Sequence, residues 1–341
     1  MNLQKAGCIM EGTATVVKHT GSHYLLAQLP SWRLFPAVLR GKVRLGGSSA
    51  TNPVAVGDRV EFHADGDLLP DGSVPASETA PAAITRILPR RNYIIRKSVN
   101  LSRQAHIIAA NVDHAFIVVT LAFPEVKLPF IDRLLVTCEV YGVKPVIVLN
   151  KIDIVDEFRD DFAPALENFH RIYEGVGYSI LEVSAKTGRG VDELRRLCLE
   201  KSEDGAPGIS LFSGVSGVGK SSLIKAMDPS LNPKTGLISE AHLQGRHTTT
   251  FYEMYPLCGG EGCIIDTPGI RGFGLVDLEP EEISLYFPEM LKAASGCRFT
   301  PCTHTHEPGC AVKVAVDEGT ISRERYASYL GMLEEYTKYR K

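Results

Sequence analysis

The sequence lacks the features that would place the protein in a membrane or outside the cell. No apolar run approaches the roughly 20 residues that a membrane-spanning helix needs. The first thirty residues contain no continuous apolar core of a secretory signal peptide. Most of the eight cysteines are scattered along the 341 residues, unlike the dense pattern of a small disulfide-stabilised domain. We therefore expect a cytoplasmic protein that has no membrane partner.

The sequence also lacks a strong excess of one charge. Its formal net charge is −3, which argues against a protein that coats nucleic acid indiscriminately. Lys and Arg outnumber Asp and Glu over residues 1–100, whereas the acids are in excess over residues 101–205. The composition is therefore compatible with a local basic face on the N-terminal segment.

The hydrophobic pattern divides the chain into three predicted domains, so we expect a multidomain protein. Residues 1–95 contain short β-rich runs separated by turns, which predicts a small β-barrel of the OB-fold type, with a flexible Pro- and Ala-rich loop over residues 64–83. Residues 105–275 alternate apolar strands with helical segments, which is typical of a doubly wound, mostly parallel α/β sheet. Residues 276–341 combine helical patterns with a cluster of Cys and His, which predicts a small helical domain.

Residues 214–221, GVSGVGKS, match the phosphate-binding loop pattern of Gly, four residues, and Gly-Lys-Ser. The loop follows an apolar strand and precedes a helical pattern, where its backbone N–H groups and the helix N-terminus can hold phosphates. Lys220 would reach the β- and γ-phosphates, with a catalytic role, and the Ser221 hydroxyl would bind Mg²⁺. The predicted phosphate contacts are Gly214, Val215, Ser216, Gly217, Val218, Gly219, Lys220, Ser221 and Ser222.

Residues 150–153, NKID, close another apolar strand and predict guanine as the base. The Asp153 carboxylate can accept hydrogen bonds from the N1–H and the exocyclic amine of guanine, a donor pair that adenine lacks. Asn150 would support the purine edge and the neighbouring loops, and the backbone at Ala185 could donate to the guanine carbonyl oxygen. The predicted guanine contacts are Asn150, Lys151, Ile152, Asp153, Ser184, Ala185 and Lys186.

Two further segments supply the remaining parts of such a site. Residues 266–269, DTPG, end an apolar strand, so that Asp266 can orient the Mg²⁺ shell and the Gly269 N–H can meet the γ-phosphate. The loop GRHTTT at residues 245–250 can provide one more Mg²⁺ ligand. The candidate Mg²⁺ ligands are Ser221, Asp266 and either Thr248 or Thr249.

The parts of this site occur in an unusual order, because both guanine segments precede the phosphate loop. In an ordinary GTPase the guanine motif follows that loop. The termini of a compact domain usually lie close together, so joining them and opening the chain elsewhere preserves the sheet and its site. We therefore expect a circularly permuted GTPase domain.

Residues 296–310, GCRFTPCTHTHEPGC, have the spacing of a metal site. Cys297, Cys302, His304 and Cys310 would form a closed tetrahedral shell of the kind that structural Zn²⁺ prefers, with no position left open for catalysis. His306 is an alternative to His304 as the fourth ligand.

In this order, the motifs closely resemble those of the circularly permuted GTPases that depend on the small ribosomal subunit, the YjeQ/RsgA family. The resemblance covers almost the whole chain and includes LRGKVR, VGDRVEF, NKID, the phosphate loop, GRHTTT, DTPGIRGFGL and the zinc segment. It implies an OB-fold, a permuted GTPase domain and a helical zinc domain with one structural Zn²⁺. It also implies binding of GTP and GDP, and of the small subunit and its rRNA late in maturation, with hydrolysis stimulated by the subunit. We expect the protein to act as a monomer.

The residue that would position the attacking water differs from that of Ras-like enzymes. Ile270 stands where those enzymes have a Gln, so we expect slow hydrolysis by the chain alone. The internal candidate for handling water is His247, as the family resemblance also implies, although this side chain could equally contact the partner. The loops that sense the γ-phosphate are followed closely by the zinc segment, so nucleotide state could reposition that segment.

Two other functions are compatible with parts of the sequence. The first is an ATP-using P-loop enzyme, against which Asp153 argues because its carboxylate selects guanine. The second is an RNA-binding scaffold with a weak nucleotide site, against which the intact Lys220, Ser221 and Asp266 argue.

Overall fold

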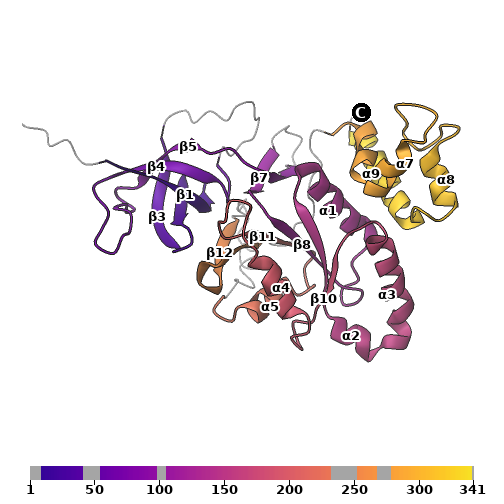
Figure 1. Ribbon diagram of the computed structural model, residues 1–341, viewed down its shortest axis with the longest axis horizontal. Helices are drawn as coiled ribbons and strands as arrows, with labels where there is room; N and C mark the ends of the chain where they lie inside the picture. The colour runs from indigo at the N-terminus through magenta and orange to yellow at the C-terminus, as the bar shows by residue number, and fades with distance from the viewer. Residues whose placement is uncertain (1–8, 41–53, 98–104, 232–251, 267–277, 340–341) are drawn as a thin grey trace, which may run out of the picture. The chain divides into compact units, whose positions relative to one another are not determined.

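The structure is a computed structural model, and it describes residues 9–40, 54–97, 105–231, 252–266 and 278–339 (Figure 1). The chain forms two compact units. One consists of Met1–His114, Asp192–Phe212 and Ile224–Pro268, and the other of Ala115–Val191, Ser213–Leu223 and Gly269–Lys341. Among the described residues, no helix is long and apolar enough to cross a membrane.

The first unit contains a closed five-stranded β-barrel. β1 pairs antiparallel with both β2 and β4, β2 pairs with β3, β3 runs parallel to β5, and β5 returns to β4. A five-stranded closed barrel of this kind is an OB-fold, so this prediction is confirmed. The strands are β1 (Ile9–Thr20), β2 (His23–Gln28), β3 (Arg33–Leu39), β4 (Arg59–Asp65) and β5 (Ala82–Ile87).

The barrel core is formed by alternate residues of its strands. Leu26, Phe62 and Ile84 are fully buried, and the rings of Phe35 and Phe62 lie 4.8 Å apart between centroids. The loop predicted over residues 64–83 connects β4 to β5, but Val74 within it is buried in the barrel core. This apolar side chain anchors the middle of the loop to the barrel.

The first unit also holds part of the α/β sheet. β11 (Ile209–Ser213) runs parallel to β13 (Gly262–Asp266), and β12 (Glu253–Leu257) pairs antiparallel with β13. The short helices α4 (Val191–Cys198) and η2 (Cys258–Gly260) precede two of these strands, and β6 (Tyr93–Lys97) and β7 (Ala105–Ala110) form a separate antiparallel ribbon.

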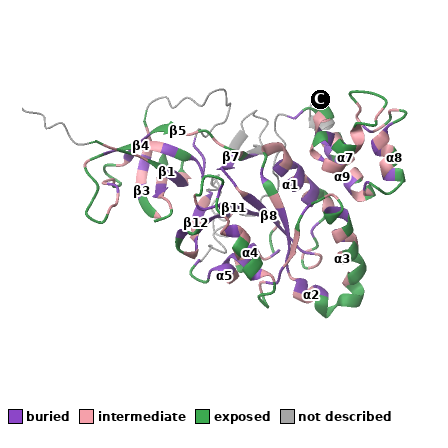
Figure 2. Ribbon diagram, viewed as in Figure 1, coloured by how far each residue is buried: buried purple, intermediate pink, exposed green. Residues whose placement is uncertain are grey.

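The second unit contains three strands in the order β10–β9–β8, of which β10 runs parallel to β9. All six residues of β8 are buried, as expected for a strand covered on both faces, whereas the outer face of α3 is exposed (Figure 2). α1 ends at Gly142, whose left-handed conformation (φ 64°) lets its N–H cap the last carbonyls. The elements are β8 (His114–Val119), α1 (Leu128–Tyr141), β9 (Lys144–Leu149), α2 (Ile152–Glu157), α3 (Arg159–Glu174) and β10 (Ile180–Glu182), with α5 (Lys220–Met227) after the phosphate loop.

The second unit also contains the C-terminal helices, as the sequence predicted. Their apolar core includes Phe287, Met290 and Tyr329, together with Val136 of α1. The helices are η3 (Pro280–Tyr286), α7 (Pro288–Ala294), α8 (Ala311–Asp317) and α9 (Arg323–Tyr339).

Candidate functional site

The phosphate loop follows β11 and has a backbone that requires glycine. Gly214, Gly217 and Gly219 have positive φ angles of 155°, 86° and 94°. A Cβ atom at Gly214 would lie 2.3 Å from the Val118 carbonyl oxygen, and one at Gly219 would lie 2.4 Å from Asn150 Nδ2. The glycines of the motif are therefore required both by conformation and by the close approach of neighbouring loops.

Lys220 begins α5 and lies within the loop. Its side chain is buried, and Nζ donates hydrogen bonds to the carbonyl oxygens of Gly214 (2.7 Å) and Val215 (3.2 Å). Ser221 and Ser222 follow in the first turn of α5, the former half-buried and the latter exposed. The loop thus holds a buried ammonium group, which can bind a polyanionic ligand.

Asn150 joins the phosphate loop to both predicted guanine segments. The side chain is 2% exposed at the end of β9. Its Nδ2 donates to the Val218 carbonyl at 2.7 Å, and its Oδ1 accepts from the Ala185 N–H at 3.3 Å. Three segments that are distant in the sequence therefore meet at one amide, as the permuted arrangement requires.

Lys151 makes a second connection to the phosphate loop. Its backbone is left-handed (φ 63°), and Nζ donates to the carbonyl oxygens of Gly217 (2.7 Å) and Phe123. The Phe123 contact was not predicted, because any residue can supply a carbonyl and no sequence signal marks it. The segment after β8 is therefore part of the site.

The Asp153 carboxylate is oriented by the other guanine segment. Oδ1 accepts a hydrogen bond from the hydroxyl of the fully buried Ser184 at 2.6 Å, and Lys186 Nζ lies 3.9 Å from Oδ2. The Asp153 side chain is 15% exposed, so it keeps access to a ligand. Ile152 is 1% exposed, so its side chain packs in the core.

Of the candidate Mg²⁺ ligands that follow the phosphate loop in the sequence, only Asp266 lies within the described residues. Asp266 ends β13 and lies in register with Phe212 of β11, the strand that leads into the phosphate loop. His247, Thr248, Thr249, Gly269 and Ile270 lie outside the described residues, so their roles stay predictions.

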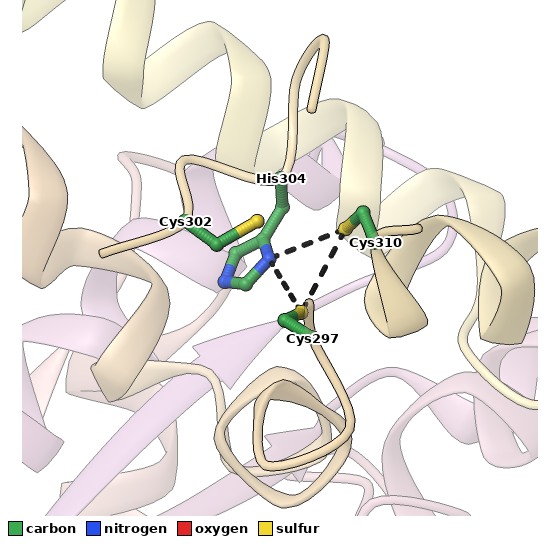
Figure 3. A group of neighbouring side chains, drawn as sticks. All are labelled: Cys297, Cys302, His304 and Cys310. Atoms are coloured by element: carbon green, nitrogen blue, oxygen red, sulfur yellow. Dashed lines mark hydrogen bonds between the residues drawn. The ribbon is translucent and has the colours of Figure 1, made fainter. Parts of the chain in front are cut away.

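The predicted zinc ligands lie together in the C-terminal segment (Figure 3). The ligand atoms of Cys297, Cys302, His304 and Cys310 all lie within 4.8 Å of one another. His304 Nδ1 is 3.6 Å from the Cys297 sulfur and 3.4 Å from that of Cys310, and these two sulfurs are 3.9 Å apart. Tetrahedral Zn²⁺ with ordinary bond lengths places sulfur and nitrogen about 3.6 Å apart and two sulfurs about 3.8 Å apart. The cluster therefore fits a zinc ion.

The structure distinguishes His304 from His306. His304 is 2% exposed, has a positive φ of 55°, and its carbonyl accepts a hydrogen bond from the Tyr326 hydroxyl at 2.6 Å. Burial lowers the pKa of His304, against the opposing charge of Glu307, which favours the neutral form that binds metals. His306 is exposed and contacts Thr305.

Together, the fold and the site define a P-loop GTPase of circularly permuted order, with an OB-fold barrel and a Cys₃His segment. The model of the RsgA GTPase family matches residues 87–276, and the chain belongs to this family. Family membership favours GTP hydrolysis over both alternative functions.

Relatives and solved structures resemble the chain over most of its length. The small ribosomal subunit biogenesis GTPases RsgA of Flavobacterium johnsoniae and Bacteroides fragilis are 45% and 46% identical, covering 94% and 95% of this chain and 93% and 98% of theirs. The crystal structure of YjeQ from Thermotoga maritima matches with a TM-score of 0.71 and 33% identity, over 96% of this chain and 98% of that one. The circularly permuted GTPase YloQ shares the fold, with a TM-score of 0.67 and 24% identity over 100% and 99% of the two chains.

Proposed function

We propose that this GTPase acts in late maturation of the small ribosomal subunit. It binds the subunit and its rRNA in the cytoplasm as a monomer, and the subunit stimulates hydrolysis of GTP to GDP and phosphate. The names of the relatives from Flavobacterium johnsoniae and Bacteroides fragilis support the role, and their likeness covers nearly the full length of both chains. The OB-fold barrel supports an RNA partner, because such barrels commonly bind oligonucleotides.

The single observation that carries the nucleotide part of the proposal is the position of Asn150. Its amide joins the phosphate loop to both guanine segments. Within this frame Asp153, held by Ser184, recognises the two guanine donors, and the stem of Lys151 lies along the base. Opposite adenine, the Asp153 carboxylate would lack the two guanine donors, and an unpaired polar group enclosed by a ligand costs about 1–3 kcal/mol.

The phosphate side of the site uses the loop around Lys220. Its ammonium group and the loop N–H groups compensate the phosphate charge, and Ser221 binds Mg²⁺ together with Asp266 and Thr248 or Thr249. Bound Mg²⁺ supplies charge neutralisation between the phosphates. His247 handles the attacking water, and the subunit completes the site, because Ile270 has no polar group for this task.

The structural zinc ion of this proposal is held by Cys297, Cys302, His304 and Cys310. The four ligand positions are all protein atoms, so the ion supplies stability to a segment with a small core.

Turnover measurements test the proposal directly. Purified protein should hydrolyse GTP slowly alone, faster with small subunits, and no faster with large subunits, while ATP should be a poor substrate. Lys220→Ala should abolish the stimulated rate, whereas Lys225→Ala, an exposed lysine on the same helix, should not change it. Equal rates with and without small subunits would contradict the proposed role.

A further inference from the structure

A fully buried arginine connects three helices of the second unit. Arg325 of α9 is 0% exposed, and NH1 donates a hydrogen bond to Oδ1 of Asp132 on α1 at 2.8 Å. Nε and NH2 donate to the two carboxylate oxygens of Glu289 on α7, at 2.6 and 3.0 Å. One guanidinium group thus holds α1 of the GTPase sheet, α7 and α9 in a single arrangement.

Aromatic rings around Arg325 restrict the orientation of its guanidinium group. The guanidinium carbon lies 4.8 Å from the centre of the Phe287 ring and 5.5 Å from that of Tyr178. Asp132 is also 0% exposed, so removal of Arg325 would leave a buried carboxylate without its cation. Only a planar fork in this position satisfies both acids, which a lysine cannot reproduce.

Other contacts of α1 with the C-terminal helices support the same attachment. Next to Asp132, Arg133 forms a half-buried ion pair with Glu335 of α9. One turn later, Val136 is buried in the apolar core of the C-terminal segment. α1 therefore lies along α9 over more than one turn (Figure 1).

The N-terminal end of α1, which also carries Asp132, is connected to the nucleotide site. The segment that leads into the helix supplies the Phe123 carbonyl to Lys151, and Lys151 also bonds Gly217 of the phosphate loop. The Thr120 hydroxyl donates a hydrogen bond to the Pro124 carbonyl, and the Thr120 carbonyl accepts one from the Val126 N–H at 3.0 Å. These two bonds hold the short segment in place. Asp132 lies near the start of α1, so the segment that contacts Lys151 leads directly into the part of the helix that binds Arg325.

We propose that α1 couples the nucleotide site to the Cys/His segment, and that Arg325 is the positioning residue for this coupling. The inference rests on the proposed function, in which the protein binds the small subunit. A shift of α1 that follows the nucleotide moves the C-terminal segment through Asp132, because packed helices move as rigid bodies between discrete positions. The coupling is reciprocal, so subunit contacts with that segment act back on the nucleotide site.

The coupling is measured as the ratio of the small-subunit affinities in the presence of a non-hydrolysable GTP analogue and of GDP. Wild-type protein should give a ratio of about 10-fold or more, within the usual range of allosteric coupling. Arg325→Met should bring the ratio near 1, with analogue affinity of the free protein within about threefold of wild type. Arg325→Lys should fall between them, because it keeps the charge but not the fork. Arg323→Met, at an exposed position of α9, should behave as wild type.

The outcomes separate coupling from folding. Arg325→Met must first be shown to hold as much Zn²⁺ per chain as wild type and to unfold with the wild-type transitions. A folded variant that keeps the wild-type ratio overturns the proposal. If the variant does not fold, Arg133→Met removes only the half-buried ion pair and should lower the ratio in part, and an unchanged ratio there overturns the proposal as well. Wild-type protein that binds the subunit equally in both nucleotide states contradicts the coupling alone, whereas failure to bind the subunit contradicts the proposed function.

Discussion

Replacement of Asn150 by Ala tests whether one amide holds the nucleotide site together. The change removes the bonds to the Val218 carbonyl and the Ala185 N–H and leaves two backbone groups without partners. Each unpaired buried group costs about 1–3 kcal/mol, so the sum is at least about 2 kcal/mol. The nucleotide must then order the loops itself, and we expect a loss of affinity of about 30-fold or more. Because neither contact involves a residue proposed to bind the γ-phosphate, GTP and GDP should weaken equally.

Fluorescent GDP and a GTP analogue, titrated into purified wild-type and variant protein, measure this effect. Asn168→Ala is the matched control, because Asn168 accepts an exposed hydrogen bond from Arg171 on α3 and lies away from the three loops. Thermal unfolding of the free variant shows whether the lost hydrogen bonds lower the stability of the free protein or only its affinity for nucleotide. A lower Tm with unchanged nucleotide affinity would refute the reasoning, since the amide would then stabilise the fold without ordering the site.

Three other predictions concern the base, the metal and the water. Asp153→Asn replaces an acceptor by a donor, so GTP affinity should fall by about 10²-fold or more while xanthosine triphosphate gains, as competition titrations will show. Unchanged GTP affinity would remove this carboxylate from the base site. Zinc removal, or Cys310→Ala, should unfold the C-terminal segment, because structural zinc contributes on the order of 10 kcal/mol to such units, while GDP binding largely survives. Metal analysis and limited proteolysis check this, and zinc-free protein with a folded segment would contradict it. His247→Ala should lower subunit-stimulated single-turnover hydrolysis by about 10²-fold with GTP and subunit affinities retained, and a normal rate would remove His247 from the catalytic residues.

The sequence predicted the parts of the site that are encoded locally. NKID, SAKTG at residues 184–188 and the phosphate loop are short patterns in which each residue type has a required chemistry. The contacts of Asn150 join the three segments in space, so their order along the chain could be permuted. Short β-rich runs separated by turns likewise predicted the barrel, because several short strands at this spacing are typical of one. The proposed domain boundaries stay predictions.

The remaining features depend on contacts that no local pattern records. The Phe123 carbonyl binds Lys151 only because the fold brings the end of β8 to the NKID loop. Val74 looks like part of a polar loop, yet it is buried in the barrel. His304 and His306 have equally plausible spacing, and only the folded chain shows that the His304 ring lies beside the cysteine sulfurs.

Arg325 is the clearest of these cases, because an Arg within an amphipathic helix looks like a solvated residue. Its partner Asp132 lies 193 positions away, so the sequence gives no local sign of the pair. A buried ion pair often adds little net stability compared with an apolar contact of the same size. The pair instead fixes the relative position of the helices, because the guanidinium group must bind two carboxylates at once. Apolar side chains alone could slide past one another. We expect a buried ion pair of this kind where a segment has to occupy a defined position. The C-terminal segment should then be displaced as a whole when α1 moves.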